Sequence, residues 1–317
     1  MASLRKPSLN LLVDYLGMAL VLAGLIVYFS LTSKTFFGLG TGLLIVNQIP
    51  ATVVLAVGMT YVLVIGGIDL SVGSVLALSG SMLGLLLIDA GWPLPAALAG
   101  CLATGLACGA VNGLITIRWQ IPSFIVTLGM LEVARGGAHL LIPGDAKDLG
   151  SINLNPKVFG VSALFLCAIA LVLVAQAALS RTVFGRYMVA VGTNEEVVRL
   201  SGIDPRPTKL AVFMLSGLLA AVAAVINCEK NDSASPNAGA GYELQAIAAV
   251  VIGGTSLMGG RGSVINSFLG VLIMEVLGTG LTDAQVADSI KRLITGVVIV
   301  LAVILDRYRH RAEQGKT

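Results

Sequence analysis

The chain has 317 residues, of which 56% are hydrophobic and only 12% are charged, and its mean hydropathy is +0.93. Because an ordinary soluble domain carries about 25% charged residues, this composition excludes a soluble globular protein. The formal net charge of +3 does not indicate nucleic-acid binding, because the charged residues lie mainly in loops between apolar runs.

The first apolar run, 11–31, follows Arg5 and Lys6, a pattern that also occurs in signal peptides. This run is too long for a signal peptide, contains Asp14 and lacks an obvious small-x-small cleavage site. We therefore interpret it as a retained first membrane span.

Apolar runs near 20 residues recur along the chain and match a hydrocarbon thickness of ~30 Å at 1.5 Å per residue. They predict an all-α fold with one integral-membrane domain over residues 1–317, a polytopic transmembrane helical bundle of about ten spans. The predicted spans are 11–31, 43–65, 71–90, 94–117, 122–142, 160–180, 209–228, 242–258, 263–281 and 290–306.

The basic residues predict the orientation of these spans. With a cytoplasmic N-terminus, 13 of the 20 Lys and Arg residues lie in inside loops or at the inside termini, 6 lie outside and Arg135 lies within a span. The positive-inside rule therefore favours ten spans with both termini in the cytoplasm.

A glycine-rich turn occurs twice. VIGGIDLSVGSV at 64–75 recurs as VIGGTSLMGGRGSV at 251–264, and each copy ends one predicted span and begins the next. Both turns face the cytoplasmic side in the ten-span arrangement, which indicates two related halves, and the glycines permit sharp bends. The alternative is a chance resemblance between glycine-rich membrane turns.

Asp69 is the only formal charge between Leu43 and Ile88, and its counterpart in the second copy is Ser256. The turn geometry therefore does not require a carboxylate. We expect Asp69 to cap the third span, with Ser71 as the rival cap; the alternative is a role in gating or in contact with a neighbouring subunit.

Three ionisable residues share one face of the fifth span. Glu132 and Arg135 are three residues apart and can pair, and His139 follows four residues later. A Glu–Arg pair that holds the bundle together is the favoured interpretation, and a proton-coupled mechanism is the alternative. Glu275 in the ninth span lacks a partner nearby in the sequence. The candidates for the translocation path or gate are Glu132, Arg135 and Glu275, together with Asp69 and Asn47.

The polar segment 181–209 is too short for a domain. Thr193 or Asn194 can cap a helix whose first turn holds Glu195 and Glu196, with Arg199 near its end and Gly202 closing it. This predicts a short cytoplasmic helix between the sixth and seventh spans. The alternative is a solvated connecting loop.

No enzyme signature is present: there is no phosphate-binding GxxxxGK[ST] loop, no HExxH and no GxSxG. We predict no catalytic residue and no metal site. The cysteines are interpreted as small packing residues; they are Cys101, Cys108, Cys167 and Cys228.

Four motifs, GGIDLSVGS, PSFIVTLGMLEVARG, VGTNEEVVRLSGI and GYELQAIAAVVIGGTSLMGGRGS, resemble the ribose/xylose/arabinose-type permease family of bacterial ABC sugar importers, within the branched-chain amino acid/sugar permease superfamily. The similarity runs from about Phe37 to Asp306 in the family's order. The segment INCEKND before the outer loop departs from the family's pattern because it is richer in charge.

The resemblance implies a permease subunit in the bacterial inner membrane that forms the path for a monosaccharide or similar polyol. Its implied partners are a second permease, a cytoplasmic ATPase with two nucleotide-binding domains and a periplasmic sugar-binding protein. No cofactor is expected on this chain, since ATP and Mg would bind the ATPase. An ion-coupled secondary sugar transporter is the alternative function.

The same resemblance assigns roles to two segments. Residues 192–203 resemble the family's coupling segment, which docks on the ATPase; the residues concerned are Gly192, Thr193, Asn194, Glu195, Glu196, Arg199 and Gly202. SASPNAGAGYEL resembles the periplasmic loop before the eighth span, and its Glu243 joins the candidates for the path or gate.

Overall fold

The structure, a computed structural model, describes residues 9–33, 35–150, 156–158 and 160–314. The fold is almost entirely helical. The helices are α1 (Leu9–Thr32), α2 (Leu39–Gln48), α3 (Pro50–Val64), α4 (Val72–Gly84), the π-helical turn η1 (Leu85–Asp89), α5 (Leu94–Trp119), α6 (Ser123–Leu141), α7 (Ala163–Arg181), α8 (Val183–Thr193), α9 (Glu195–Leu200), α10 (Arg206–Asn231), α11 (Tyr242–Ile252), α12 (Val264–Asp283) and α13 (Asp288–Gln314).

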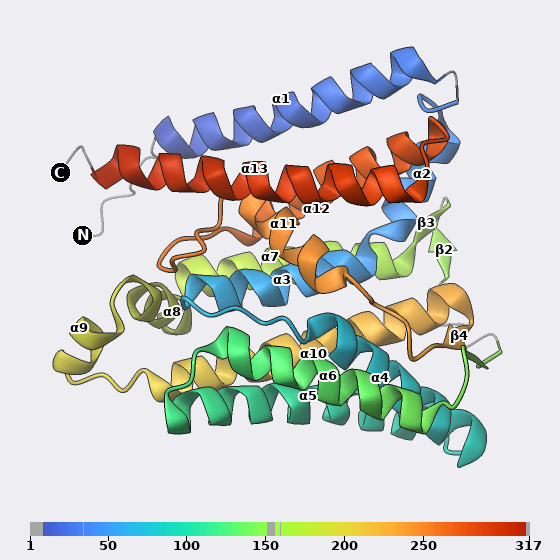
Figure 1. The fold of residues 1–317 in the computed structure, drawn as a ribbon, viewed down its shortest axis with the longest axis horizontal. Coiled ribbons are helices and arrows are strands. Elements are labelled where there is room, and N and C mark those ends of the chain that lie inside the picture. Colours follow the sequence, from blue (N-terminus) through green and yellow to red (C-terminus); the bar gives the residue numbers. More distant parts are fainter. Residues whose placement is uncertain (1–8, 34, 151–155, 159, 315–317) are drawn as a thin grey trace.

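Most of the long helices run along the long axis of the molecule, as expected for a membrane bundle (Figure 1). Helices α1 and α13 form one side, α5 and α6 form the opposite side, and α3 lies between them. Helix α1 begins, and α13 finishes, at the end of the molecule that also carries α9, which we call the α9 end. The predicted all-α membrane bundle is confirmed in this coarse form.

Four two-residue strands lie at the end opposite α9 (Figure 1). Strand β1 (Lys147–Asp148) pairs antiparallel with β4 (Ser233–Ala234), with Lys147 opposite Ala234. Strand β2 (Lys157–Val158) pairs with β3 (Val161–Ser162). The first pair joins the α6–α7 link to the α10–α11 link, which are far apart in the sequence.

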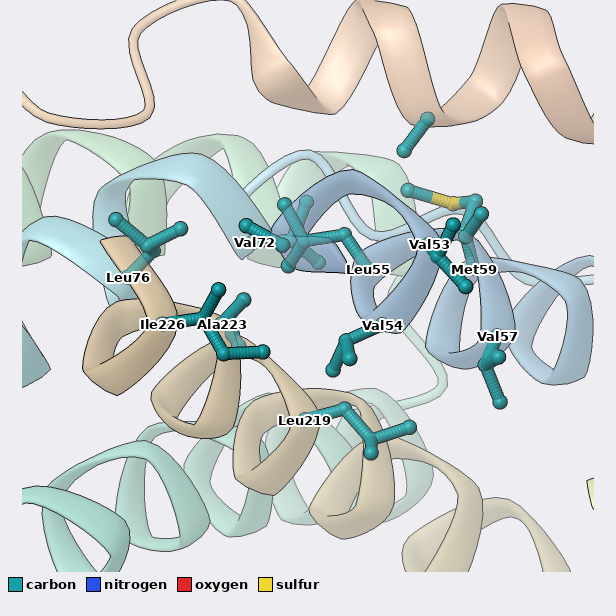
Figure 2. Packing of buried hydrophobic residues seen from close by; sticks show 14 of the residues in the cluster. Val53, Val54, Leu55, Val57, Met59, Val72, Leu76, Leu219, Ala223 and Ile226 are labelled. Atoms are coloured by element: carbon teal, nitrogen blue, oxygen red, sulfur yellow. The ribbon is translucent and has the colours of Figure 1, made fainter. Parts of the chain in front are cut away.

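Helix α3 forms the centre of the hydrophobic core. Its sequence, PATVVLAVGMTYVLV, is apolar on nearly every face, and 14 of its residues are buried. A helix that is apolar all round is expected to be buried on all sides. Figure 2 shows Val54 and Leu55 of α3 packed near Leu219 and Ala223 of α10.

Helices α5 and α10 approach closely because glycines line their contact. A Cβ atom at Gly105 would overlap the carbonyl oxygen of Gly217, and one at Gly109 would overlap that of Phe213. Glycines four residues apart on one helix allow the two backbones to touch, as is common between membrane helices. Of the four free cysteines, Cys101 and Cys228 are buried, Cys108 is half-buried and Cys167 is exposed.

The predicted count of ten spans is not confirmed. In the described part of the chain, six helices are long and apolar enough to cross a membrane, or seven if the bent pair α2–α3 is one span. The pair bends by 47° because Pro50 cannot continue the hydrogen-bond ladder of α2. The predicted span 242–258 contains only the 11 residues of α11, about 16 Å of helix.

Candidate functional site

The predicted short helix in the polar segment is present as α9. The side chain of Asn194 accepts a hydrogen bond from the backbone N–H of Val197 at 3.0 Å, so Asn194 rather than Thr193 is the cap. At the other end, Gly202 has φ +82° and its N–H bonds to the carbonyl of Arg199. The segment also contains α8, which the sequence reasoning missed.

Helix α9 presents apolar side chains outward. Val197 and Leu200 are 55% and 79% exposed, whereas Val198 faces inward and is buried. Glu195 forms an ion pair with Lys209 of α10 at 2.8 Å, and this pair fixes α9 against the bundle. Beside α9 lies a cavity of 780 Å³, lined by the end of α3, the α5–α6 turn and the start of α10.

The two glycine turns end their helices in the same way. After α3, the N–H groups of Gly66 and Gly67 bond to the carbonyls of Leu63 and Val62; after α11, those of Gly254 and Thr255 bond to Val251 and Val250. Gly66 and Gly254 have φ +76° and +80°, so each turn is a Schellman motif.

The predicted alignment of these turns therefore needs two corrections. The sequence alignment of 64–67 with 251–254 pairs Gly66 with Gly253. The Schellman geometry instead makes Gly66 equivalent to Gly254, which is a shift of one residue. The Gly-Ser-Val sequence that both copies share also has a different structural position in each. Gly73 lies inside α4, whereas Gly262 precedes α12. The helix ends are equivalent, and the links that follow them are not.

Both turns meet the last residues of α8. The N–H of Gly260 bonds to the carbonyl of Val64 at 2.8 Å. A Cβ atom at Gly192 would overlap both that carbonyl and the N–H of Gly260, and a Cβ atom at Gly259 would lie 2.7 Å from the Gly192 carbonyl oxygen. The backbones of α8 and the two turns are thus in direct contact, immediately before α9.

Asp69 does not cap α4 as predicted. The N-cap residue is Ser71, and no side-chain capping bond is formed there. Asp69 is instead buried, 1% exposed, and its carboxylate accepts hydrogen bonds from the N–H and Oγ of Ser71 and from Oγ of Ser216 at 2.8 Å. Asn112 of α5 donates to Ser71 Oγ. The carboxylate therefore joins the 65–71 link to α10 and, through Ser71, to α5.

Two residues of α6 that the sequence reasoning did not select also hold this link. Ser123 Oγ accepts the N–H of Ile68 at 2.9 Å, and Thr127 Oγ1 accepts the N–H of Leu70 at 3.1 Å. These bonds satisfy backbone donors of a non-helical segment inside the bundle, where an unpaired N–H is costly. Their spacing of four residues on α6 was the available signal.

The predicted ion pair between Glu132 and Arg135 is not formed. The Arg135 guanidinium donates to the carbonyl oxygens of Pro236 and Ala238 at 2.6 and 2.8 Å, so it braces the link before α11. Glu132 and His139 are exposed on α6. Glu243 lies at the start of α11, where its Oε2 fills the space left by the missing side chain of Gly73.

The remaining two predicted residues lie in different settings. Asn47 exchanges hydrogen bonds with the turn 160–162, donating to the Gly160 carbonyl and accepting from the Ser162 N–H, so it holds this turn in place. Glu275 lines a cavity of 1290 Å³ between α2, α11, α12 and α13, together with Gln48 and Gln245. The predicted path residues are therefore not gathered in one place.

Comparisons with known proteins agree with the membrane architecture. Residues 41–303 match a family described as the branched-chain amino acid transport system / permease component. The ribose import permease protein of Escherichia coli K12 is 39% identical over 294 residues, covering 89% of this chain and 90% of that protein. The ribose import permease protein of Bacillus subtilis 168 is 37% identical over 298 residues, 92% of each chain.

The name of a third relative refers to a different sugar. The D-allose transport system permease protein of Escherichia coli K12 is 33% identical over 314 residues, 96% of each chain. No solved structure matches the chain significantly.

Proposed function

The chain belongs to the family of branched-chain amino acid transport system permease components, and from that premise we propose that it is the membrane-spanning subunit of an ABC importer for a monosaccharide or similar polyol. The observation that carries this proposal is the 39% identity over 89% of the chain to a ribose import permease. The family resemblance seen in the sequence motifs is confirmed, and no comparison favours a secondary transporter.

In this proposal, a cytoplasmic ATPase docks on α9. The helix is rigidly capped at both ends, is tied to α10 by Glu195 and Lys209, and exposes Val197 and Leu200. Exposed apolar side chains on a short helix suit a groove on a partner protein. The ATPase would bind ATP and Mg, and a second permease and a periplasmic sugar-binding protein would complete the importer.

We also propose that the chain passes through the inner membrane ten times, with both termini in the cytoplasm. Two of these passes would each combine a non-helical link with a helix, namely 65–71 with α4 and 235–241 with α11. Such broken helices are tolerated at membrane depth where they are buried in protein. This explains how a helix of 11 residues can form part of a pass.

Thiol labelling tests this topology. In a background without the native cysteines, Ser233→Cys should react with a membrane-impermeant reagent added to the periplasmic side. Thr193→Cys should react only after the membrane is opened. The reverse pattern would overturn the orientation.

Uptake tests the energy source and the docking role. Sugar uptake into proteoliposomes should require ATP, the ATPase and the binding protein, and should persist when ion gradients are collapsed. Glu195→Lys, which replaces the ion pair to Lys209 with repulsion, and Gly202→Pro should abolish uptake with normal membrane insertion. Glu196→Lys is the matched control, because the ion pair that Glu196 forms within the described residues is with the exposed Arg199 of the same helix. We expect a weaker effect from it.

A further inference from the structure

The cavity between α2, α11, α12 and α13 has a mixed polar and apolar lining. Its lining includes the amides of Gln48 and Gln245, the hydroxyls of Thr279 and Thr295, and the carboxylate of Glu275. Polar side chains within membrane helices are costly unless they face protein, water or a ligand. The volume of 1290 Å³ is ample for a small molecule, since ligand sites are commonly about 300–1,000 Å³.

Three of these groups come from three different helices and line the same cavity. Gln48 is the last residue of α2, at the break before Pro50. Gln245 lies in the first turn of the short helix α11. Glu275 is in the middle of α12 rather than at either of its ends.

The two carboxylates of this cavity differ in their hydrogen bonding. Asp283, at the end of α12, accepts hydrogen bonds from the hydroxyls of Ser33 and Thr35, so it ties the α1–α2 link to α12. Within the described residues, Glu275 has one hydrogen-bond partner, Thr279 Oγ1 at 3.5 Å, beyond the usual O–H···O range of 2.5–3.0 Å. Its acceptor capacity is therefore nearly unused.

We propose that this cavity is a sugar-binding site of the permease itself, in which Glu275 accepts hydrogen bonds from hydroxyl groups of the ligand and Gln48 and Gln245 bind further hydroxyls. The proposal rests on the proposed function and deepens it. A carboxylate can accept two hydrogen bonds from neighbouring hydroxyls, and such charge-assisted bonds are strong. Amide side chains both donate and accept, as hydroxyl groups require.

Selectivity is the consequence of this arrangement. A site that hydrogen-bonds a hydroxyl group rejects an analogue without it, because its own polar groups are then left unpaired. The permease would therefore contribute to the choice of sugar, in addition to any selection by a binding protein.

Direct binding to the full-length permease in lipid nanodiscs tests the proposal without partner subunits. Equilibrium dialysis is carried out with radiolabelled D-ribose, D-fructose, D-allose, L-arabinose and, as a non-sugar probe, L-leucine. We expect saturable binding of at least one sugar. Glu275→Gln, which keeps the size but removes the charge, should weaken it roughly tenfold, and Gln245→Leu should also weaken it.

Two controls separate recognition from folding. Met274→Leu changes the neighbouring position of α12, outside the cavity lining, and should leave the affinity unchanged. Deoxy analogues of the bound sugar should bind the native chain with lower affinity than the sugar does. For the analogue that lacks the hydroxyl group bound by Glu275, the ratio of the two affinities should be smaller in Glu275→Gln than in the native chain. A purely structural role of Glu275 would not alter the ratio between two ligands.

Unchanged affinity in both Glu275→Gln and Gln245→Leu would overturn the inference. Absence of sugar binding by the native permease, combined with ATP-driven sugar uptake by the complete importer, would overturn it while the proposed function stands. Binding of L-leucine in preference to every sugar would overturn both.

Discussion

The two glycine turns begin alike and continue differently. Each ends its helix with the same pair of backbone hydrogen bonds and a glycine at positive φ. The link after α3 then runs through the bundle interior, held by Asp69, Ser123 and Thr127. The link after α11 folds on itself, with the N–H of Ser256 bonded to the carbonyl of Arg261 at 3.0 Å.

Asp69 and Ser256 show where the similarity stops. Each side chain accepts the backbone N–H two residues later, Ser71 and Met258 respectively. Among the described residues, Asp69 also reaches another helix, through Ser216 of α10, whereas Ser256 does not. Local sequence therefore determines how these helices end, whereas the surrounding helices determine the path of the chain afterwards.

Gly192→Ala should have the largest effect, because it acts on both turns together. Its Cβ would overlap the carbonyl of Val64 and the N–H of Gly260, and backbone atoms cannot move aside as side chains do. We expect a loss of about 3 kcal/mol or more in the free energy of unfolding, measured by thermal unfolding in detergent. Gly129→Ala on α6, with nothing within 4 Å of the new Cβ, is the control. Equal stability of the two variants would show that the turns are not in contact with α8.

Asp69→Ala should destabilise much more than Ser256→Ala. Removing the carboxylate leaves the N–H of Ser71 and two hydroxyl groups without their acceptor, at about 1–3 kcal/mol for a buried unpaired group. Ser256→Ala removes one local bond, worth about 1 kcal/mol. Asp69→Asn should lie between them, because the amide retains one acceptor oxygen. Paired unfolding curves give the ranking, and equal losses would mean that the bond to Ser216 adds nothing.

Gly67 of the first turn is equivalent to Thr255 of the second turn. Gly67→Thr therefore introduces the residue that the second turn already has. A Cβ at Gly67 would lie 3.2–3.3 Å from Val62 and Phe213, so we expect a loss of about 1–2 kcal/mol from crowding. The motif itself should survive, since the second turn accommodates a threonine here. A stability equal to that of the native chain would show that the Phe213 side chain adjusts freely.

Gly66→Ala and Gly254→Ala should have small effects that are equal to each other. Both residues require a left-handed backbone, which costs an L-residue about 1–2 kcal/mol. Asparagine at either position should recover part of this loss, because it tolerates that conformation. Clearly unequal losses in the same unfolding assay would indicate that the two helix ends are not equivalent.

The parts of the fold that depend on neighbouring residues could be predicted from the sequence. Asn194, Glu195 and Gly202 indicated α9 with its cap and its closing glycine, because capping acts within a few residues. Runs of apolar residues indicated the helices of the bundle for the same reason. The family resemblance also followed from short motifs.

The contacts that could not be predicted from the sequence join residues that are far apart in the chain. Ser216, which donates to Asp69, is 147 residues away in the chain, and no local pattern connects them. Arg135 offered a nearby carboxylate, Glu132, yet it binds carbonyls more than a hundred residues later. The count of ten spans is not confirmed at α11, because apolar composition alone does not reveal where a helix stops inside a bundle.

The burial of α3 has a consequence for synthesis of the protein. Helix α10, one of its main packing partners (Figure 2), begins 142 residues after Val64 at Arg206, which is roughly 7–28 seconds of translation at about 5–20 residues per second. During that interval α3 must remain in the bilayer without the helix that later covers it. Its apolar sequence keeps it stable there, because lipid can solvate every face of the helix that protein will later cover. The residues that form the core of the finished permease thus also keep its precursor soluble in the membrane.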